Sequence, residues 1–290
     1  MPTRQAVRAG SFYEADPQAC RRHAEQLIAA AEVPDDLPEA RRGGIVPHAG
    51  WMFSGRVAAR TLKALTASGA APTFVLFGAD HTGTVARGEV YDAGAWRTPL
   101  GDAPVDEELA AAVLSSDGPL RANCSAHAYE HSIEVQVPLI QVLAPEARIL
   151  PIAVAPNDQA VEVGRTVARA VSGHDGVACV VGSTDLTHHG GHFGSPGGRG
   201  RQGVEWTRSN DRRMVRLLER MAAEGIVPEA EARGNACGAG AAAATVAACA
   251  ELGATRGIVL EYTNSYEVLS ELAPGRADET TVGYVAVVFA

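Results

Sequence analysis

The sequence predicts an α/β protein, a single domain of residues 1–290 built as a three-layer αβα sandwich around a central mixed, largely parallel sheet. Short β-branched and apolar runs alternate along the chain with stretches of helical periodicity, as they do in α/β folds. The strand runs are apolar throughout, which is typical of strands covered on both faces. No internal repeat or long linker divides the 290 residues, a length that one large α/β domain accommodates.

The predicted strands are short apolar segments bounded by glycine, proline or polar residues. In chain order they cover residues 44–47, 73–77, 88–91, 148–154, 176–181, 257–261 and 281–289. The predicted helices carry apolar residues at spacings of three and four. They cover residues 54–66, 105–114, 130–143, 157–171, 207–223 and 237–252, with a further short helix near Pro228. Asp102 and Asn157 are expected at helix N-termini, and the glycine-rich residues 190–203 are expected to form a loop.

The composition excludes several classes of protein. The 25 Lys and Arg residues against 34 Asp and Glu residues give a net charge of −9, so we expect neither nucleic-acid binding nor a polybasic membrane surface. The chain shows no export signal and no apolar run of about 18 residues, which predicts a cytoplasmic protein without a membrane span. The 5 cysteines are irregularly spaced and form no CxxC motif, so free thiols are expected rather than a disulfide framework.

Polar residues follow four of the predicted strands immediately. They are residues 47–50 (PHAG), 79–81 (ADH), 183–189 (STDLTHH) and 262–265 (YTNS). Because ligands of open α/β sheets bind beyond the carboxyl ends of the strands, we expect these residues on one rim of the sheet. A single histidine after a strand is more often a loop residue that hydrogen-bonds a carbonyl, so the prediction depends on several of them sharing the rim.

His48 and His81 predict a metal site most directly. Imidazole is the commonest protein ligand for metals, and two imidazoles with one anionic or thiolate group form a three-ligand site with open positions. Cys237 supplies a thiol at the start of an alanine-rich helix, whose dipole is expected to favour the thiolate. Cys237 could also be a nucleophile, or a small buried hydrophobic residue, which is the interpretation for Cys179 and Cys249.

Residues 130–134 (EHSIE) place two carboxylates, a histidine and a serine at the start of a predicted helix. Glu130 and Glu134 are four residues apart and would share one helix face. In one interpretation the segment caps and orients the helix. In the other, Glu130 and His131 line the same pocket as the strand-end histidines. The sequence leaves both interpretations open.

In chain order these segments resemble the Memo family (mediator of ErbB2-driven cell motility), whose bacterial and archaeal members are labelled AmmeMemoRadiSam system protein B. The resemblance covers nearly the whole chain, and PHAG and EHSIE are its most specific pieces. The matching segments are residues 8–13 (RAGSFY), 46–51 (VPHAGW), 77–81 (FGADH), 96–100 (WRTPL), 130–134 (EHSIE), 149–152 (ILPI), 183–185 (STD), 188 (H), 237–238 (CG) and 282–284 (VGY).

The resemblance implies a fold like that of the class III extradiol (LigB-type) non-haem iron dioxygenases. It also implies one iron, copper or zinc ion held by His48, His81 and Cys237, with Asp185 and His188 beside them as catalytic groups. In the related dioxygenases the third ligand is a carboxylate. A thiolate in that place favours softer or more redox-active metals, so dioxygenase chemistry does not simply carry over to this chain.

The chain departs from the family pattern at two places. Residues 80–82 are Asp-His-Thr where the family often has Ser-His-His, which removes an accessory imidazole. His189 follows His188 where the family often has an aromatic residue, so either histidine could be the one in the pocket.

Three functions are consistent with these residues. The first is a metal-dependent redox or oxygenase-like enzyme. The second is a non-catalytic module that binds a peptide or protein at the same pocket. The family label suggests an AMMECR1-like protein and a radical SAM enzyme as partners, and eukaryotic relatives are associated with phosphorylated peptides. The third is nucleophilic chemistry at Cys237, activated by His48 or His188.

Overall fold

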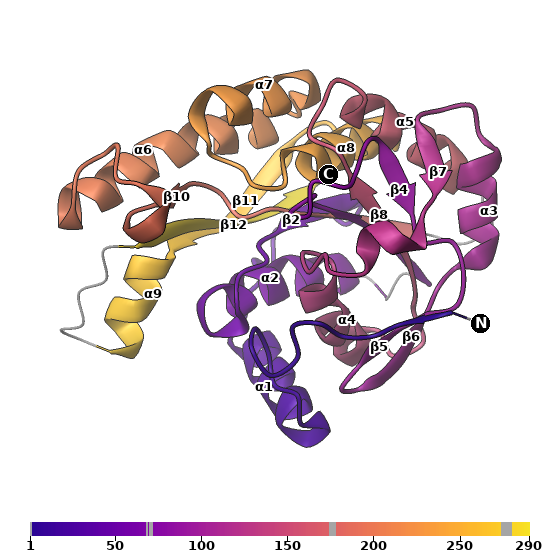
Figure 1. Cartoon of the computed structure of the whole chain (residues 1–290), viewed down its shortest axis with the longest axis horizontal. Coiled ribbons are helices and arrows are strands. Elements are labelled where there is room, and N and C mark those ends of the chain that lie inside the picture. The colour runs from indigo at the N-terminus through magenta and orange to yellow at the C-terminus, as the bar shows by residue number, and fades with distance from the viewer. Residues whose placement is uncertain (1, 68, 70–71, 174–177, 274–279) are drawn as a thin grey trace.

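The computed structural model describes residues 2–67, 69, 72–173, 178–273 and 280–290, and the statements below concern these residues. The helices and strands alternate along the chain as Figure 1 shows. The strands are β1 (Thr3–Arg4), β2 (Gly43–Val46), β3 (Thr73–Gly78), β4 (Gly88–Val90), β5 (Ala95–Thr98), β6 (Gly101–Pro104), β7 (Leu120–Ala122), β8 (Arg148–Val154), β9 (Ala178–Ser183), β10 (His188–His189), β11 (Gly257–Asn264) and β12 (Thr281–Phe289). The α-helices are α1 (Pro17–Ala30), α2 (Trp51–Thr66), α3 (Glu107–Ser115), α4 (Val137–Leu143), α5 (Ala160–Ser172), α6 (Gly200–Glu219), α7 (Ala223–Arg233), α8 (Ala239–Glu251) and α9 (Ser265–Leu272), and short 3-10 turns cover Cys124–His127, Glu134–Gln136 and Gly191–Phe193.

The described strands form one large mixed sheet and one small sheet. The large sheet runs β10-β12-β2-β9-β3-β8-β4-β7, with β11 paired to β12, and the small one runs β1-β5-β6. The central strands β2, β9, β3 and β8 are parallel, whereas β12 and β4 join them antiparallel. Val46 pairs with Ser183 and Phe77 with Gly182, so β2, β9 and β3 end level with one another. The loops that follow these three strands therefore leave the sheet at one rim.

Alternate residues of the central strands enter two separate cores. On β3, Phe74 and Leu76 belong to the core beneath α1, α2 and α4, whereas Val75 and Phe77 belong to the core beneath α5, α7 and α8. Figure 1 shows these two groups of helices on opposite sides of the sheet. This arrangement explains why the strands are apolar throughout, because neither face is exposed to water. The predicted three-layer αβα fold is confirmed.

The alanine-rich helix α8 lies at the centre of one helical layer. Eleven of its residues are buried, from Ala239 to Cys249. It approaches α5 so closely that a Cβ on Gly164 would lie 2.0 Å from the carbonyl oxygen of Ala244. The small side chains thus permit close helix packing. Among the described helices, none has the length and apolarity that a membrane crossing requires.

The predicted helix over residues 130–143 is wrong in its first half. Residues 130–133 are not helical, a 3-10 turn covers Glu134–Gln136, and α4 begins at Val137 with Pro138 in its first turn. The Glu130 carboxylate accepts hydrogen bonds from the backbone amides of His131 and Ser132. These bonds hold the segment in a turn, and proline suits the start of the helix that follows.

Two predicted helix N-termini and one loop also need correction. Asp106, rather than Asp102, caps α3 by accepting a hydrogen bond from the amide of Leu109 at 3.0 Å. Asn157 accepts the amide of Gln159 in a turn before α5, so it is not the cap of that helix. The predicted loop over residues 190–203 ends early, because α6 begins at Gly200.

Other differences concern strand ends and elements that were not predicted. Strand β11 continues to Asn264, so most of the polar cluster 262–265 lies within a strand. Residues 176–177, the predicted start of β9, lie outside the described residues. The elements without a sequence prediction are β1, β5, β6, β7, β10, α1 and α9.

Candidate metal centre

His48 lies in the loop between β2 and α2, at the rim where the parallel strands end. The side-chain amide of Gln136 donates a hydrogen bond to the carbonyl of Pro47, and the backbone amide of His48 donates to Oδ1 of Asp185 at 2.7 Å. His48 is 2% exposed. The loop is therefore held from both sides, and the imidazole has a fixed place inside the protein.

The hydrogen bonds of the His48 ring determine which nitrogen carries the proton. Nδ1 lies 2.9 Å from Oγ of Ser183, and that hydroxyl donates to the carbonyl of Ser132 at 2.8 Å. Because the hydroxyl proton is used on a carbonyl, Oγ accepts from Nδ1–H and the lone pair of the ring lies on Nε2. Nε2 is 3.1 Å from Sγ of Cys237. In the metal-free protein the thiol therefore donates its proton to Nε2.

Cys237 reaches this position from the turn before α8. Its amide donates to the carbonyl of Asp185, and a Cβ on the adjacent Gly238 would lie 2.2 Å from the carbonyl oxygen of Ser183. Desolvation raises the pKa of the Cys237 thiol strongly, and the charge of Asp185 raises it further. The expected thiolate at a helix N-terminus is therefore wrong for the metal-free protein. A metal cation at this place would be needed to stabilise the thiolate.

His81 follows β3 and is held by Glu130. The Glu130 carboxylate accepts the His81 amide at 2.8 Å and ring Nδ1 at 3.0 Å, and it is itself 1% exposed. Burial lowers the pKa of His81, but the hydrogen bond and charge of Glu130 outweigh burial and leave that pKa raised. The pKa of Glu130 is lowered despite burial, because His81 and backbone amides stabilise the carboxylate. Nε2 of His81 is then the nitrogen available to a ligand.

His131 completes the cluster from the EHSIE turn. Its ring stacks on that of His81, with centroids 4.7 Å apart and an interplanar angle of 26°, and it meets the ring of His48 edge-on at 5.6 Å. Burial and the charge of His81 lower its pKa to about 4. Its Nδ1 is buried without a hydrogen-bond partner among the described residues. Of the two interpretations of EHSIE, the position of Glu130 and His131 agrees with the pocket role, and their hydrogen bonds also orient the turn.

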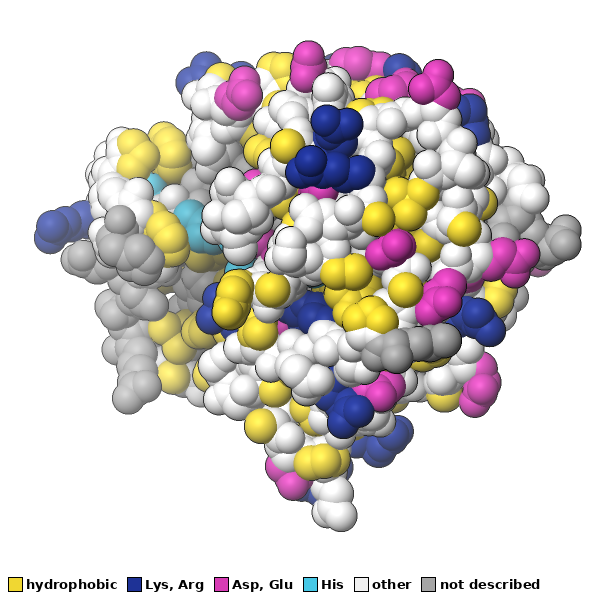
Figure 2. All heavy atoms as spheres, turned by 45° about the vertical axis from the view of Figure 1, so that its right-hand side comes forward, with side chains coloured by type: hydrophobic (Ala, Val, Ile, Leu, Met, Phe, Trp, Pro, Cys, Tyr) yellow, Lys and Arg dark blue, Asp and Glu magenta, His cyan; other side chains and the backbone are white. Residues whose placement is uncertain are grey.

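The donor set fits a metal ion. One ligand atom from each of His48, His81 and Cys237 lies within 4.8 Å of the other two, and the same holds for His81, Glu130 and His131. In the first group each imidazole already has its other nitrogen bound to a hydroxyl or carboxylate, which is how ligand histidines are oriented in metalloproteins. The residues predicted as ligands are thus brought together by three separate segments. Figure 2 shows histidine side chains recessed below one face of the molecule.

Asp185 and His188 lie beside this group. Burial raises the pKa of Asp185 to about 7, although its carboxylate accepts the backbone amides of His48 and Ala49. His188 is close enough for its charge to lower the pKa of His48, and its Nδ1 is 3.1 Å from the carbonyl of Leu186. His189 is buried against Trp206 of α6, with ring centroids 5.3 Å apart. The geometry therefore places His188, rather than His189, toward the metal centre.

The fourth predicted polar cluster, residues 262–265, contributes no side chain to the histidine–cysteine group. Tyr262 donates a hydrogen bond to Asp211, and Asn264 caps α9. Asp211 was not singled out in the sequence, although burial raises its pKa to about 6 and it also accepts the amide of Thr187. Nothing in the local sequence of α6 marks this aspartate, because its partners come from β11 and from the loop after β9.

Glu134 also has a role that the sequence did not reveal. Its carboxylate accepts the amides of Val7 and Arg8 and the hydroxyl of Tyr13, and it pairs with Arg4 at 2.8 Å. The second carboxylate of EHSIE thus fixes the N-terminal segment RAGSFY against the cluster. The sequence offered one hint of this contact, namely that RAGSFY and EHSIE are both among the segments that resemble the Memo family.

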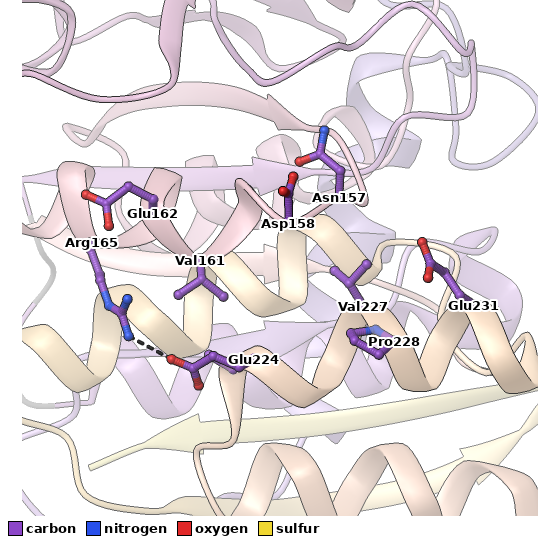
Figure 3. Close-up of a pocket in the computed structure, with 10 residues that line it drawn as sticks. Asn157, Asp158, Val161, Glu162, Arg165, Glu224, Val227, Pro228 and Glu231 are labelled. Carbon is purple, nitrogen blue, oxygen red and sulfur yellow. Dashed lines mark hydrogen bonds and ion pairs between the residues drawn. The ribbon is translucent and has the colours of Figure 1, made fainter.

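Away from the cluster, a hollow of about 470 Å³ lies between α5 and α7, and we call it the α5–α7 groove (Figure 3). Four carboxylates and one arginine line it together with apolar side chains, and Arg165 is paired with Glu224 at 2.7 Å. Its lining residues are Asn157, Asp158, Val161, Glu162, Arg165, Ala223, Glu224, Val227, Pro228 and Glu231.

Comparisons with known proteins match the sequence over almost its whole length. Residues 4–288 match the family described as Memo-like protein. A MEMO1 family protein of Methanopyrus kandleri is 36% identical over 97% of this chain and 96% of its own length. Those of Methanothermobacter thermautotrophicus and Thermococcus onnurineus are 36% and 35% identical, over 93% and 97% of this chain and 96% and 97% of their own lengths.

Proposed function

The chain belongs to the Memo family, and from this premise and the geometry of the histidine–cysteine cluster we propose that it is a metal-dependent redox protein with a mononuclear centre. The ligands are Nε2 of His48, Nε2 of His81 and Sγ of Cys237. One observation carries the proposal: two imidazoles and a thiol from separate segments converge, and both imidazoles have their second nitrogen already fixed by Ser183 and Glu130.

The donor set restricts the metal. Imidazoles suit iron, copper and zinc alike, and a thiolate moves the preference toward softer or more redox-active ions. We therefore expect iron or copper as the active ion. Zinc would compete for the same ligands but has no redox chemistry. When bound, such an ion supplies electron transfer and Lewis acidity at the open positions.

The residues around the ligands orient them and handle protons. Glu130 holds the His81 ring through Nδ1, and Ser183 does so for His48. Asp185, whose pKa is raised to about 7 by burial, can hold a proton near neutral pH while its carboxyl group positions the amide of His48. His188 donates from Nδ1 to the carbonyl of Leu186, and we assign it the exchange of protons with a bound ligand.

Metal analysis of the full chain, purified without a chelating tag and reloaded with Fe(II), Cu(I) or Zn(II), tests the proposal. We expect about one equivalent in the parent and a loss in Cys237→Ala, because removal of one of three ligands leaves two neutral imidazoles. Cys124→Ala is the matched control, since Cys124 is also partly exposed but contacts Asp92 instead. Absence of metal from the parent, or equal metal in Cys237→Ala, would contradict the site.

A second experiment separates chemistry from binding. The parent loaded with iron or copper should cycle between oxidation states under a mild reductant and air, followed by electron paramagnetic resonance. His188→Gln should keep the metal and slow the cycle, because it removes a proton carrier without removing a ligand. A loaded parent whose metal cannot be reduced or reoxidised would leave a binding protein rather than a redox protein.

The second candidate function is a protein- or peptide-binding module, which Tyr129 favours. This tyrosine directly precedes Glu130 and is 77% exposed, and tyrosine is enriched at protein interfaces. The partners to test are an AMMECR1-like protein and a radical SAM enzyme. Pull-down from native lysate with the parent, Tyr129→Ala and His48→Ala tests this candidate. The binding module would be favoured if Tyr129→Ala lost the captured partner but kept the redox cycling of the metal.

A further inference from the structure

Arg8 brings a positive charge to the edge of the histidine–cysteine cluster without an acidic partner among the described residues. Its guanidinium lies over the ring of Phe12, 5.1 Å from the centroid, and Nε is buried without a hydrogen-bond acceptor. An arginine in this state is unusual, because buried donors are nearly always hydrogen-bonded. The guanidinium without an acceptor among the described residues is the starting observation.

The backbone that carries Arg8 is firmly held. The amides of Val7 and Arg8 donate to the Glu134 carboxylate at 2.8–3.0 Å, and the hydroxyl of Tyr13 donates to the same group. Arg4 pairs with Glu134 as well. The nearest carboxylate is thus already saturated by other donors, which explains why the Arg8 guanidinium does not pair with it.

The Arg8 side chain is adjacent to the proposed metal centre. Phe12, beneath the guanidinium, meets the ring of His131 edge-on with centroids 5.0 Å apart, and His131 stacks on His81. The charge of Arg8 also contributes, after burial and the charge of His81, to lowering the pKa of His131. The contact through Phe12 and this electrostatic effect both place the cation near His131, at the edge of the cluster.

We propose that Arg8 is a specificity-determining residue that binds an anionic oxygen group, a carboxylate or a phosphate, on the ligand that enters the metal centre. This inference rests on the proposed function for its setting, and it adds the substrate class. A guanidinium offers parallel N–H donors that match carboxylate and phosphate oxygens, and such charge-assisted bonds are about twice as strong as neutral ones. The anion provides an acceptor for the guanidinium, which has no acidic partner among the described residues.

Binding of three probes by isothermal titration calorimetry tests the proposal. They are benzoate, phenyl phosphate and the neutral benzamide, each titrated into the full chain with and without its metal. Parent protein is compared with Arg8→Gln and with Arg22→Gln, a matched loss of one charge on the exposed side of α1. We expect Arg8→Gln to weaken one or both anions by about tenfold or more, given the strength of charge-assisted hydrogen bonds, and to leave benzamide unchanged.

The outcomes separate the ligand source from the metal question. A selective loss for benzoate identifies a carboxylate ligand, and a selective loss for phenyl phosphate identifies a phosphate ligand. Equal affinities in the parent and Arg8→Gln, including no binding of either anion to either form, would overturn the proposal. The metal-free protein still carries Arg8. If Arg8→Gln weakens anion binding in the metal-loaded protein but not in the metal-free protein, the anion binds to Arg8 and to the metal together. Failure to bind metal at all is detected separately and leaves the metal-free comparison intact.

Discussion

The histidine–cysteine cluster and the α5–α7 groove are both lined by titratable side chains, yet their chemistry differs completely. In the cluster, Glu130 is 1% exposed and accepts donors from His81, His131 and Ser132. In the groove, the side chain of Glu224 is 68% exposed and pairs with that of Arg165, which is 43% exposed. The groove holds about 470 Å³ of space (Figure 3).

The difference teaches that the volume of a hollow and the reactivity of its lining are separate properties. Water screens charges that are exposed, so a groove carboxylate interacts weakly with its neighbour. Buried groups interact in a less polarisable medium, which is why the pKa values of His48, His131, Asp185 and Cys237 all depart from their usual values. Perturbed groups gathered in one place indicate a functional site better than space does.

The largest effect expected from this contrast is on metal binding by the cluster as a function of pH. The raised pKa values of Cys237 and His81 mean that bound metal must displace protons from both, whereas His48, with its lowered pKa, is already neutral. Affinity should therefore rise with pH by about tenfold per unit for the thiol proton, with a steeper rise at pH values below the raised pKa of His81. Competition with a chelator at several pH values measures this slope. A flat profile would mean that the cluster holds no thiol or imidazolium to deprotonate.

The next effect is the loss of one buried carboxylate. Glu130→Gln should reduce the free energy of unfolding by about 2–4 kcal/mol, because a buried group loses acceptors for several N–H donors at once. It should also free the His81 ring and weaken metal binding. Urea unfolding of the metal-free protein measures the first effect without interference from the second. A change below about 0.5 kcal/mol would show that the turn at residues 130–133 is not held by this carboxylate.

The smallest effect is expected in the groove. Glu224→Gln is the matched substitution to Glu130→Gln, and it should change the free energy of unfolding by no more than about 1 kcal/mol, as is usual for exposed ion pairs. Metal content should be unchanged. The same urea titration applies, repeated at high salt, where the small difference should shrink. If Glu224→Gln proved as costly as Glu130→Gln, the distinction between the two regions by burial would fail.

Much of the candidate site could be predicted from the sequence. His48, His81 and Cys237 are recognisable because each follows or precedes a regular element in a short motif, and the rule that parallel strands end at one rim brings the first two together. The roles of Glu130 and His131 could not be decided, because EHSIE satisfies the pattern of a helix start. The structure shows a turn instead, since Glu130 accepts the amides that a helix would have left free.

Other features depend on contacts between distant segments. The choice between His188 and His189 required the position of α6, which contacts His189 through Trp206. The unpaired charge of Arg8 is visible only once Glu134 is seen to be saturated by other donors. Neither fact has a local sequence signal.

The sequence by itself indicated the family, the layered α/β architecture and the three residues that the structure brings together as a group able to hold a metal. These follow from periodicity and from motifs, which are properties of neighbouring residues along the chain. The tertiary structure alone decided the protonation of the cluster: which nitrogen of His48 and of His81 can face a metal, and that the Cys237 thiol keeps its proton without a metal. It also decided that Nε of Arg8 has no acceptor in the part of the chain that the structure describes. Burial and hydrogen bonding fix these states, and both arise only when segments 49 to 189 residues apart are brought together.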